Sequence, residues 1–228
     1  MKNTKELIPA CIETPRVATD AVIFAVIDGA LKVLLIRIGR GTYEGQWALP
    51  GGLVRMDESL DRAAERILSE KAGVDGIYLE QLGAFGDLDR DRRGRNVSIA
   101  YFALVNGEEY LPHTIEYYSD IAWKDVSRLP ELAFDHAKIV TTGIDRLRNK
   151  LGYSNIAYGL LPKEFTLTEL QTVYESILDR PLDKRNFRKK IVGIGLVKET
   201  GKIRKSGPSR PARLYSFADR KPKMVDVL

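Results

Sequence analysis

The sequence is poor in cysteine and histidine and has no long apolar run. Its single cysteine, Cys11, excludes an internal disulfide and a cysteine-rich metal site. Two histidines, His113 and His136, are too few for a histidine metal site or a catalytic triad. No stretch reaches about 18 apolar residues, so we expect no transmembrane helix. The N-terminal segment lacks the apolar core of a secretory signal, so a cytoplasmic protein without membrane contact is expected.

The rest of the composition is that of a globular protein with two differently charged parts. The 228 residues are 44% apolar and 29% charged, which is enough for a core without disulfides. Residues 1–160 contain 20 Lys and Arg against 23 Asp and Glu, whereas residues 161–228 contain 16 against 8. This asymmetry predicts either a basic module that binds a polyanion or a solvated basic tail.

Periodicity in the first 150 residues predicts alternating strands and helices. Apolar, β-branched residues at 21–27 and 31–37 flank Asp28-Gly29, a strong signal for a hairpin turn. Residues 59–72 repeat apolar side chains at spacings of three and four and end before Gly73, as a helix does. Further strands are expected at 78–85, 97–105 and 121–123, and a closing helix at 134–150.

The pattern changes after a mixed segment with two glycines and a proline, which is typical of a linker. Thr166 and Glu169 have the spacing of a capping box that opens a helix. A second helix capped by Asp183 and a final hairpin follow, and this order predicts a winged helix-turn-helix. The predicted organisation is a first domain at 1–150, a linker at 151–162 and a second domain at 163–228.

A segment within the first domain resembles the sequence signature of the Nudix hydrolases. The signature spaces a glycine, several glutamates, an arginine and a second glycine along a loop and one helix. The sequence Leu-Pro-Gly-Gly, which leads into the segment, adds to the match. The resemblance implies an α/β fold, a Nudix-like α/β/α sandwich with a mixed sheet. The matching positions are Gly52, Glu58, Arg66, Leu68, Glu70, Gly73 and Val74.

The departures from the signature fall on its metal ligands. The family pattern has glutamates at three positions where this chain has Ile67, Glu70 and Lys71. Mg²⁺ needs several anionic oxygens, and an ammonium group at the same place repels it. We therefore predict no enzyme, no metal, no cofactor and no catalytic residue. Glu58, Arg66 and Glu70 either stabilise the helix or keep residual metal chemistry.

A site without its catalyst can still bind a small molecule. The Gly51-Gly52 backbone can approach a phosphate closely, and Lys71 can replace Mg²⁺ as the charge partner of a diphosphate. Trp47 either stacks on a base or packs in the core. The predicted effector-binding residues are Arg37, Trp47, Gly51, Gly52, Glu58, Arg66, Glu70 and Lys71.

The loop at residues 87–95 carries four arginines and three aspartates. It predicts either a contact with an anion or a second subunit, or a solvated connection whose ion pairs contribute little. His136 is expected to begin the closing helix rather than to act as a ligand or a base.

The second helix of the basic module places its cations on one face. Phe187 and Ile191 are spaced to anchor the opposite side. Arginine and lysine bind guanine edges or phosphates, although a charged surface helix has the same pattern. The basic loop of the hairpin suits phosphates or a minor groove. The predicted DNA contacts are Lys184, Arg185, Asn186, Arg188, Lys189, Lys202, Arg204, Lys205, Arg210 and Arg213.

The whole chain is similar to the Nudix-related transcriptional regulators of bacterial NAD metabolism. The resemblance implies a repressor whose Nudix-like domain senses ADP-ribose or a related nucleotide, and whose winged domain holds palindromic operator DNA as a homodimer. Alternatives are a branch that senses arabinose, a weakly active ADP-ribose pyrophosphatase, a bifunctional enzyme and regulator, and an RNA-binding protein. The similar segments are 83–86, 89–91, 97–101, 133–136, 161–171 and 183–189.

Overall fold

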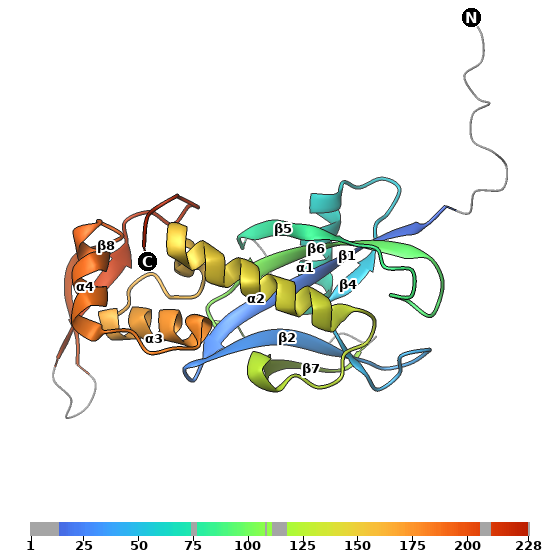
Figure 1. The fold of residues 1–228 in the computed structure, drawn as a ribbon, viewed down its shortest axis with the longest axis horizontal. Coiled ribbons are helices and arrows are strands. Elements are labelled where there is room, and N and C mark those ends of the chain that lie inside the picture. The colour runs from blue at the N-terminus through green and yellow to red at the C-terminus, as the bar shows by residue number, and fades with distance from the viewer. Residues whose placement is uncertain (1–13, 74–76, 108, 111–117, 206–210, 228) are drawn as a thin grey trace, which may run out of the picture.

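The structure is a computed structural model that describes residues 14–73, 77–107, 109–110, 118–205 and 211–227. Figure 1 shows a sheet covered by helices at one end of the molecule and a smaller part, coloured orange and red, at the other. No helix within the described ranges is long and apolar enough to span a membrane.

Within the described residues, seven strands form one mixed sheet. The first two strands are joined by the turn predicted at Asp28-Gly29, whose φ angles are 52° and 71°. The first and sixth strands pair in parallel and the other pairs are antiparallel, which confirms the mixed sheet. The two shortest strands are too short to produce a periodic signal in the sequence. The strands are β1 (Arg16–Ile27), β2 (Ala30–Ile38), β3 (Trp47–Ala48), β4 (Gly51–Leu53), β5 (Leu79–Phe85), β6 (Asn96–Leu104) and β7 (Tyr118–Asp125).

Helices cover both faces of this sheet, as the sandwich requires. The first helix, α1 (Leu60–Ala72), is capped by the Ser59 side chain and packs Leu68 against the Ile23 side of β1. The second helix, α2 (His136–Tyr153), crosses the other face (Figure 1). It approaches β1 so closely that a Cβ at Gly143 would lie 3.1 Å from the Phe24 ring. Alternate residues of β1 therefore contact different helices, and β1 lies inside the sandwich.

The smaller part has the predicted winged helix fold, made of α3 (Leu167–Leu178), α4 (Lys184–Gly193) and the hairpin of β8 (Val197–Arg204) with β9 (Ala212–Phe217). The capping box is present, because the Thr166 and Glu169 side chains each accept the other's backbone N–H. Phe165 and Tyr215 exchange backbone hydrogen bonds at 2.9 and 2.7 Å, which adds a short strand beside the hairpin.

The two parts share one apolar core. Residues 151–162 contain the end of α2 and a 3-10 helix, Ile156–Gly159, and the side chains of Leu151, Ile156 and Leu160 there are buried. The segment predicted as a linker is therefore packed into this core, because its apolar side chains outweigh the effect of its glycines. The domain limits at 150 and 163 stay a prediction.

The C-terminal segment, residues 218–227, returns from β9 to the end of α2. The Asn155 side chain donates to two of its carbonyl groups at 3.0 and 2.9 Å and accepts the Lys223 backbone N–H at 2.8 Å. Val227 is buried in the shared core. Across the junction, Ser176 of α3 donates to the Gly29 carbonyl in the β1–β2 turn at 2.7 Å. Both contacts fix the winged helix against the sheet domain.

Candidate functional site

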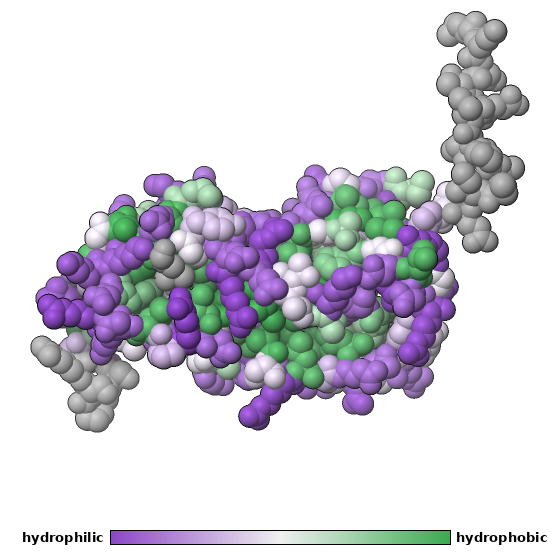
Figure 2. All heavy atoms as spheres, in the orientation of Figure 1, coloured by the Kyte–Doolittle hydropathy of each residue, from purple (hydrophilic) through white to green (hydrophobic). Residues whose placement is uncertain are grey.

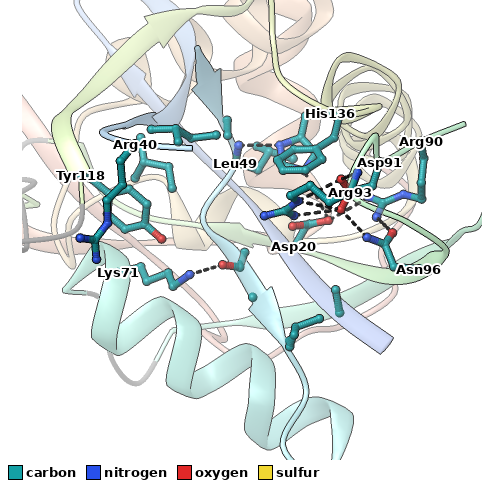
Figure 3. Close-up of a pocket in the computed structure, with 18 residues that line it drawn as sticks. Asp20, Arg40, Leu49, Lys71, Arg90, Asp91, Arg93, Asn96, Tyr118 and His136 are labelled. Atoms are coloured by element: carbon teal, nitrogen blue, oxygen red, sulfur yellow. Dashed lines mark hydrogen bonds and ion pairs between the residues drawn. The ribbon is translucent and has the colours of Figure 1, made fainter. Parts of the chain in front are cut away.

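A cavity of about 330 Å³ lies at one end of the sheet, between β1, β2, β4, α1, the loop at 87–95 and the start of α2. Figure 3 shows its polar side chains in two groups. Asp20, Arg90, Asp91, Asn96 and His136 lie on one side, and Arg40, Lys71 and Tyr118 lie on the other.

A buried carboxylate, Asp20 of β1, lies at the centre of the first group. It accepts hydrogen bonds from Ser98 Oγ at 2.6 Å and Arg90 Nη2 at 3.2 Å, and His136 Nε2 lies 3.5 Å away. Burial works to raise the pKa of Asp20, but the interactions with His136, Ser98 and Arg90 lower it to about 2. Asp20 is therefore ionised at neutral pH. Only glycine fits at Gly51 of the paired strand, because a Cβ there would lie 1.9 Å from Asp20 Oδ1.

Arg90 and Asp91 bring the charged loop at 87–95 into the cavity wall. Arg90 Nη2 also donates to Asp135 Oδ1 at 2.8 Å, and Nη1 donates to Asn96 Oδ1 at 2.5 Å. Asn96 Nδ2 in turn donates to Asp91 Oδ2 at 2.5 Å. Since Arg90 and Asp91 are buried and face the cavity, this part of the loop is not the solvated connection of the second interpretation. Arg90 is already paired with Asp20 and Asp135, so its charge is balanced within the cavity wall.

Lys71 of α1 presents its ammonium group to the opposite side of the cavity. Its Nζ donates to the Gly51 carbonyl and lies 5.4 Å from the centre of the Tyr118 ring (Figure 3). Burial lowers the pKa of Lys71, while the nearby Asp20 carboxylate acts in the other direction. Arg40 and Arg93 also line the cavity, and Arg93 Nη2 lies 2.9 Å from Asp91 Oδ2.

Aromatic rings give the cavity an apolar surface beside these charges. Phe134 has a φ of 59°, which a bulky residue rarely adopts. Its ring lies 4.2 Å from the Tyr43 ring, and the Arg93 guanidinium carbon lies 4.9 Å from its centre. Strained backbone of this kind gathers at ligand sites, where the surrounding contacts hold it in place. The mixture of cations and rings fits a ligand with both phosphates and an aromatic base.

The remaining glutamates of the Nudix signature are engaged with arginine. Arg66 Nη2 lies 2.6 Å from Glu58 Oε1, and Arg66 Nη1 lies 3.1 Å from Glu70 Oε2. The hydrogen bond from Arg66 lowers the pKa of Glu58 to about 2. Ile67 is fully buried, and the Lys71 ammonium group points toward the Gly51 carbonyl of β4. These residues do not fit the divalent cation that Nudix hydrolases use, and no cluster of three metal-binding side chains occurs within the described ranges.

The structure brings three of the eight predicted effector-binding residues into the cavity wall, Gly51, Gly52 and Lys71. Arg37 is exposed and donates to the Gly45 carbonyl at 2.9 Å, outside the cavity. Trp47 packs against the core, with Lys124 Nζ 4.2 Å from its ring. Glu58, Arg66 and Glu70 form the ion pairs described above and do not line the cavity.

Sequence reasoning missed Asp20, Asn96 and the aromatic side chains of the cavity, whereas Arg90 and Asp91 lie in the loop at 87–95, for which an anion contact was one of the interpretations. Asp20 is a charged residue inside a strand that is otherwise apolar and buried, and such a position signals a functional carboxylate. Arg40 lies in the glycine-rich stretch after β2, and no spacing pattern marks it. His136 begins α2 as expected, and its Nδ1 accepts the Leu49 backbone N–H at 2.9 Å.

The exposed face of α4 carries four of the ten predicted DNA contacts. Asp183 caps this helix by accepting the Asn186 N–H at 2.8 Å, and Phe187 and Ile191 hold its other face in the core. The end of the molecule that contains α4 is mainly hydrophilic in Figure 2. The exposed polar residues of this helix are Lys184, Arg185, Asn186 and Lys189, together with Lys190, which we had not predicted.

The predicted wing residues differ in how they are held. Lys205 is exposed, and Arg210 lies outside the described residues. Lys202 and Arg204 form ion pairs with acidic residues near the start of α3, and Arg213 pairs with Glu199 on β8. Arg188 of α4 is half-buried and donates to Thr168 Oγ1 at 2.8 Å, so it also joins α4 to α3.

Comparison with known proteins agrees with this two-part fold. The sequence matches the NUDIX domain family over residues 17–142 and the NrtR DNA-binding winged helix domain over residues 157–217. It is 40% identical to the ADPR responsive transcriptional repressor NtrR of Acinetobacter baylyi over 209 residues, which are 90% of this chain and 83% of that protein. It is 34% identical to an ADP-ribose pyrophosphatase of Methanocaldococcus jannaschii over 126 residues, 55% of this chain and 71% of that protein.

Solved structures cover both parts of the chain. Shewanella oneidensis NrtR complexed with a 27mer DNA is 36% identical with a TM-score of 0.78, over 88% of this chain and 93% of that chain. The NUDIX domain of the same NrtR complexed with ADP ribose is 35% identical with a TM-score of 0.55, over 62% of this chain and 94% of that chain. The protein described here therefore belongs to the NrtR family, in which a NUDIX domain precedes a DNA-binding winged helix domain.

Proposed function

We propose that this chain is a transcriptional repressor that binds operator DNA through α4 and releases it when ADP-ribose enters the cavity. The observation that carries the proposal is the presence of an anion-binding cavity and a basic, exposed helix in one rigidly joined chain. The relatives named above are described as responsive to ADPR or solved with ADP ribose or DNA, which supports the same two ligands here.

The chemistry of the cavity supports a nucleotide with a diphosphate. Lys71 supplies a charge-assisted hydrogen bond to a phosphate oxygen, and Arg40 and Arg93, which line the same cavity, add positive charge near it. Phe134 and Tyr118 provide aromatic surface for the base. Effector binding at this site requires no metal ion, because the Lys71 ammonium group replaces Mg²⁺ as the positive partner of the diphosphate.

Binding without hydrolysis follows from the state of the glutamates. A Nudix hydrolase uses carboxylates to hold Mg²⁺ and activate water. In this chain Glu58 and Glu70 are neutralised by Arg66, and a third signature position is the buried Ile67. We propose that the chain is not an enzyme and that Mg²⁺ does not support turnover of ADP-ribose.

Recognition of an operator by this chain requires two copies. A single α4 reads only a few base pairs in one major groove, and a homodimer doubles this contact on a palindrome. Effector binding would change the relative placement of the two recognition helices. A coupling of about 1–3 kcal/mol would weaken DNA binding by about 5- to 150-fold. The regulated genes would include genes of NAD metabolism, as the family resemblance implies.

Fluorescence anisotropy tests the proposal directly. The purified chain is titrated into labelled duplex DNA from upstream of its own gene, and into a scrambled duplex, at one fixed salt concentration. We expect selective binding that ADP-ribose weakens. Selective binding that responds to arabinose instead would contradict the effector assignment. Loss of selectivity together with Mg²⁺-dependent hydrolysis of ADP-ribose would make the chain a pyrophosphatase.

A further inference from the structure

Two wing cations are already paired with carboxylates. Lys202 Nζ donates to Glu164 Oε1 at 2.8 Å, and Arg204 Nη1 donates to Glu169 Oε1 at 2.6 Å. Arg204 Nη2 also donates to the Glu164 backbone carbonyl at 3.1 Å. Both cations lie on β8, and both carboxylates lie at the start of the winged helix domain.

Glu169 is held at both of its oxygens. Oε2 accepts the Thr166 N–H at 2.6 Å as part of the capping box, while Oε1 accepts from Arg204. The carboxylate therefore cannot turn away from the wing without losing the cap of α3. Its negative charge is a fixed feature of the surface that a DNA backbone would approach.

We propose that Glu164 and Glu169 are positioning residues that occupy Lys202 and Arg204 in place of phosphates and so suppress binding to arbitrary duplex DNA. The proposal rests on the proposed DNA-binding function and adds to it the determinant of selectivity. The chain then depends on α4, whose exposed Lys184, Arg185 and Lys189 form no ion pair within the described ranges, to gain affinity from base edges and nearby phosphates.

The physical reason is the source of non-specific affinity. A cation that neutralises a DNA phosphate releases a counterion, and each such contact contributes a slope of about −0.9 to log K against log salt. A cation that already has a carboxylate partner gains less free energy on binding a phosphate, because it must give up that partner first. On arbitrary DNA a protein adopts the orientation that gives most phosphate contacts, whereas on an operator the base contacts of α4 fix the orientation. The carboxylates that pair with the wing cations therefore weaken binding to arbitrary DNA more than they weaken binding to the operator.

Two substitutions at Glu169 separate charge from structure. Glu169→Gln removes the charge and keeps an oxygen that can complete the capping box. Glu169→Asp keeps the charge and shortens the side chain, so it weakens the cap. Glu164→Gln removes the second charge. Glu65→Gln combined with Glu44→Gln, two exposed changes outside the winged helix, alters the net charge by the same two units as Glu164→Gln with Glu169→Gln and is the matched control.

The experiment measures anisotropy on scrambled and operator duplexes at several salt concentrations, and the salt at which each protein elutes from heparin. For the variant with Glu164→Gln and Glu169→Gln we expect affinity for scrambled DNA to rise by about 2- to 30-fold, as loss of two exposed ion pairs allows. The salt slope should steepen by about 1 to 2 and elution should require more salt. Operator affinity should rise less, so that the ratio between the two duplexes falls.

Other outcomes decide against the proposal. Scrambled-DNA affinity and heparin elution equal to those of the control with Glu65→Gln and Glu44→Gln would overturn it. A Glu169→Asp variant that binds scrambled DNA more tightly than Glu169→Gln would overturn it too, because the weakened cap and not the lost charge would then raise the affinity. A wild-type chain that does not select its operator would refute the proposed function instead. In that case the scrambled duplex and heparin readouts still decide whether the carboxylates restrain the wing.

Discussion

Replacing Lys71 with methionine tests the assignment of the cavity as the effector site. The change removes the ammonium group and keeps an unbranched apolar side chain, so the packing along α1 is preserved. We expect ADP-ribose to bind more weakly, because the variant loses a charge-assisted hydrogen bond to the diphosphate.

The structure sets the size of this effect. A hydrogen bond to a charged group contributes about 1.5–3 kcal/mol, which corresponds to about a 10- to 150-fold higher Kd. Burial has already lowered the pKa of Lys71, so folding has already removed much of the water around its ammonium group. The charged form binds the anion better, and wild-type affinity should therefore fall as alkaline pH deprotonates Lys71, whereas the variant's affinity should lose this dependence.

Isothermal titration calorimetry measures both effects at several pH values, and thermal unfolding checks that the variant stays folded. Lys124→Met is the matched control, because Lys124 lies over Trp47 and does not line the cavity. An unchanged Kd for the Lys71 variant, or an equal loss in the control, would show that the diphosphate does not contact Lys71.

Three further outcomes are expected. EDTA should leave ADP-ribose affinity unchanged, and added Mg²⁺ should produce no AMP by chromatography, since Arg66 neutralises the remaining signature glutamates; metal-dependent turnover would disprove this. Arg185→Ala with Lys189→Ala should reduce operator affinity and lower the salt slope by about 2, with ADP-ribose affinity intact; unaltered DNA binding would exclude α4 as the recognition helix. Asp20, whose pKa is lowered to about 2, should contribute about 2 kcal/mol of stability that is present above pH 4 and lost as the pH falls toward 2. Denaturant unfolding of Asp20→Asn should lack this acid-side loss, and an identical pH profile would contradict the assignment.

The regular elements with strong local signals were predictable from the sequence. The helix at 167–178, its capping box and the Asp28-Gly29 turn appear at the expected residues, because propensity and capping act over a few neighbouring positions. The two shortest strands, β3 and β4, were not predictable, since two or three residues carry no periodicity. The packing of the segment at 151–162 was not predictable, because glycine and proline signal a change of direction and say nothing of burial.

The cavity was harder to predict than the fold. Its wall joins Asp20, the loop at 87–95 and His136, which only the sheet topology brings together. The Nudix signature directed attention to the outer face of α1, where Arg66 pairs with two glutamates, and only Lys71 of that helix turns toward the cavity. The wing cations were predicted, but their partners were not, because a count of positive charge does not reveal that Lys202 and Arg204 have acidic partners.

The continuous core between the sheet domain and the winged helix has a consequence for signalling. Within the described residues, the buried side chains of 151–162, the contact of Ser176 with the β1–β2 turn and the returning C-terminal segment join the two parts of the chain. In the proposed homodimer, each copy would therefore move as one unit that carries α4 at its end. A small rotation between the two copies would become a larger displacement of the two recognition helices, and so a mismatch with the spacing of successive major grooves.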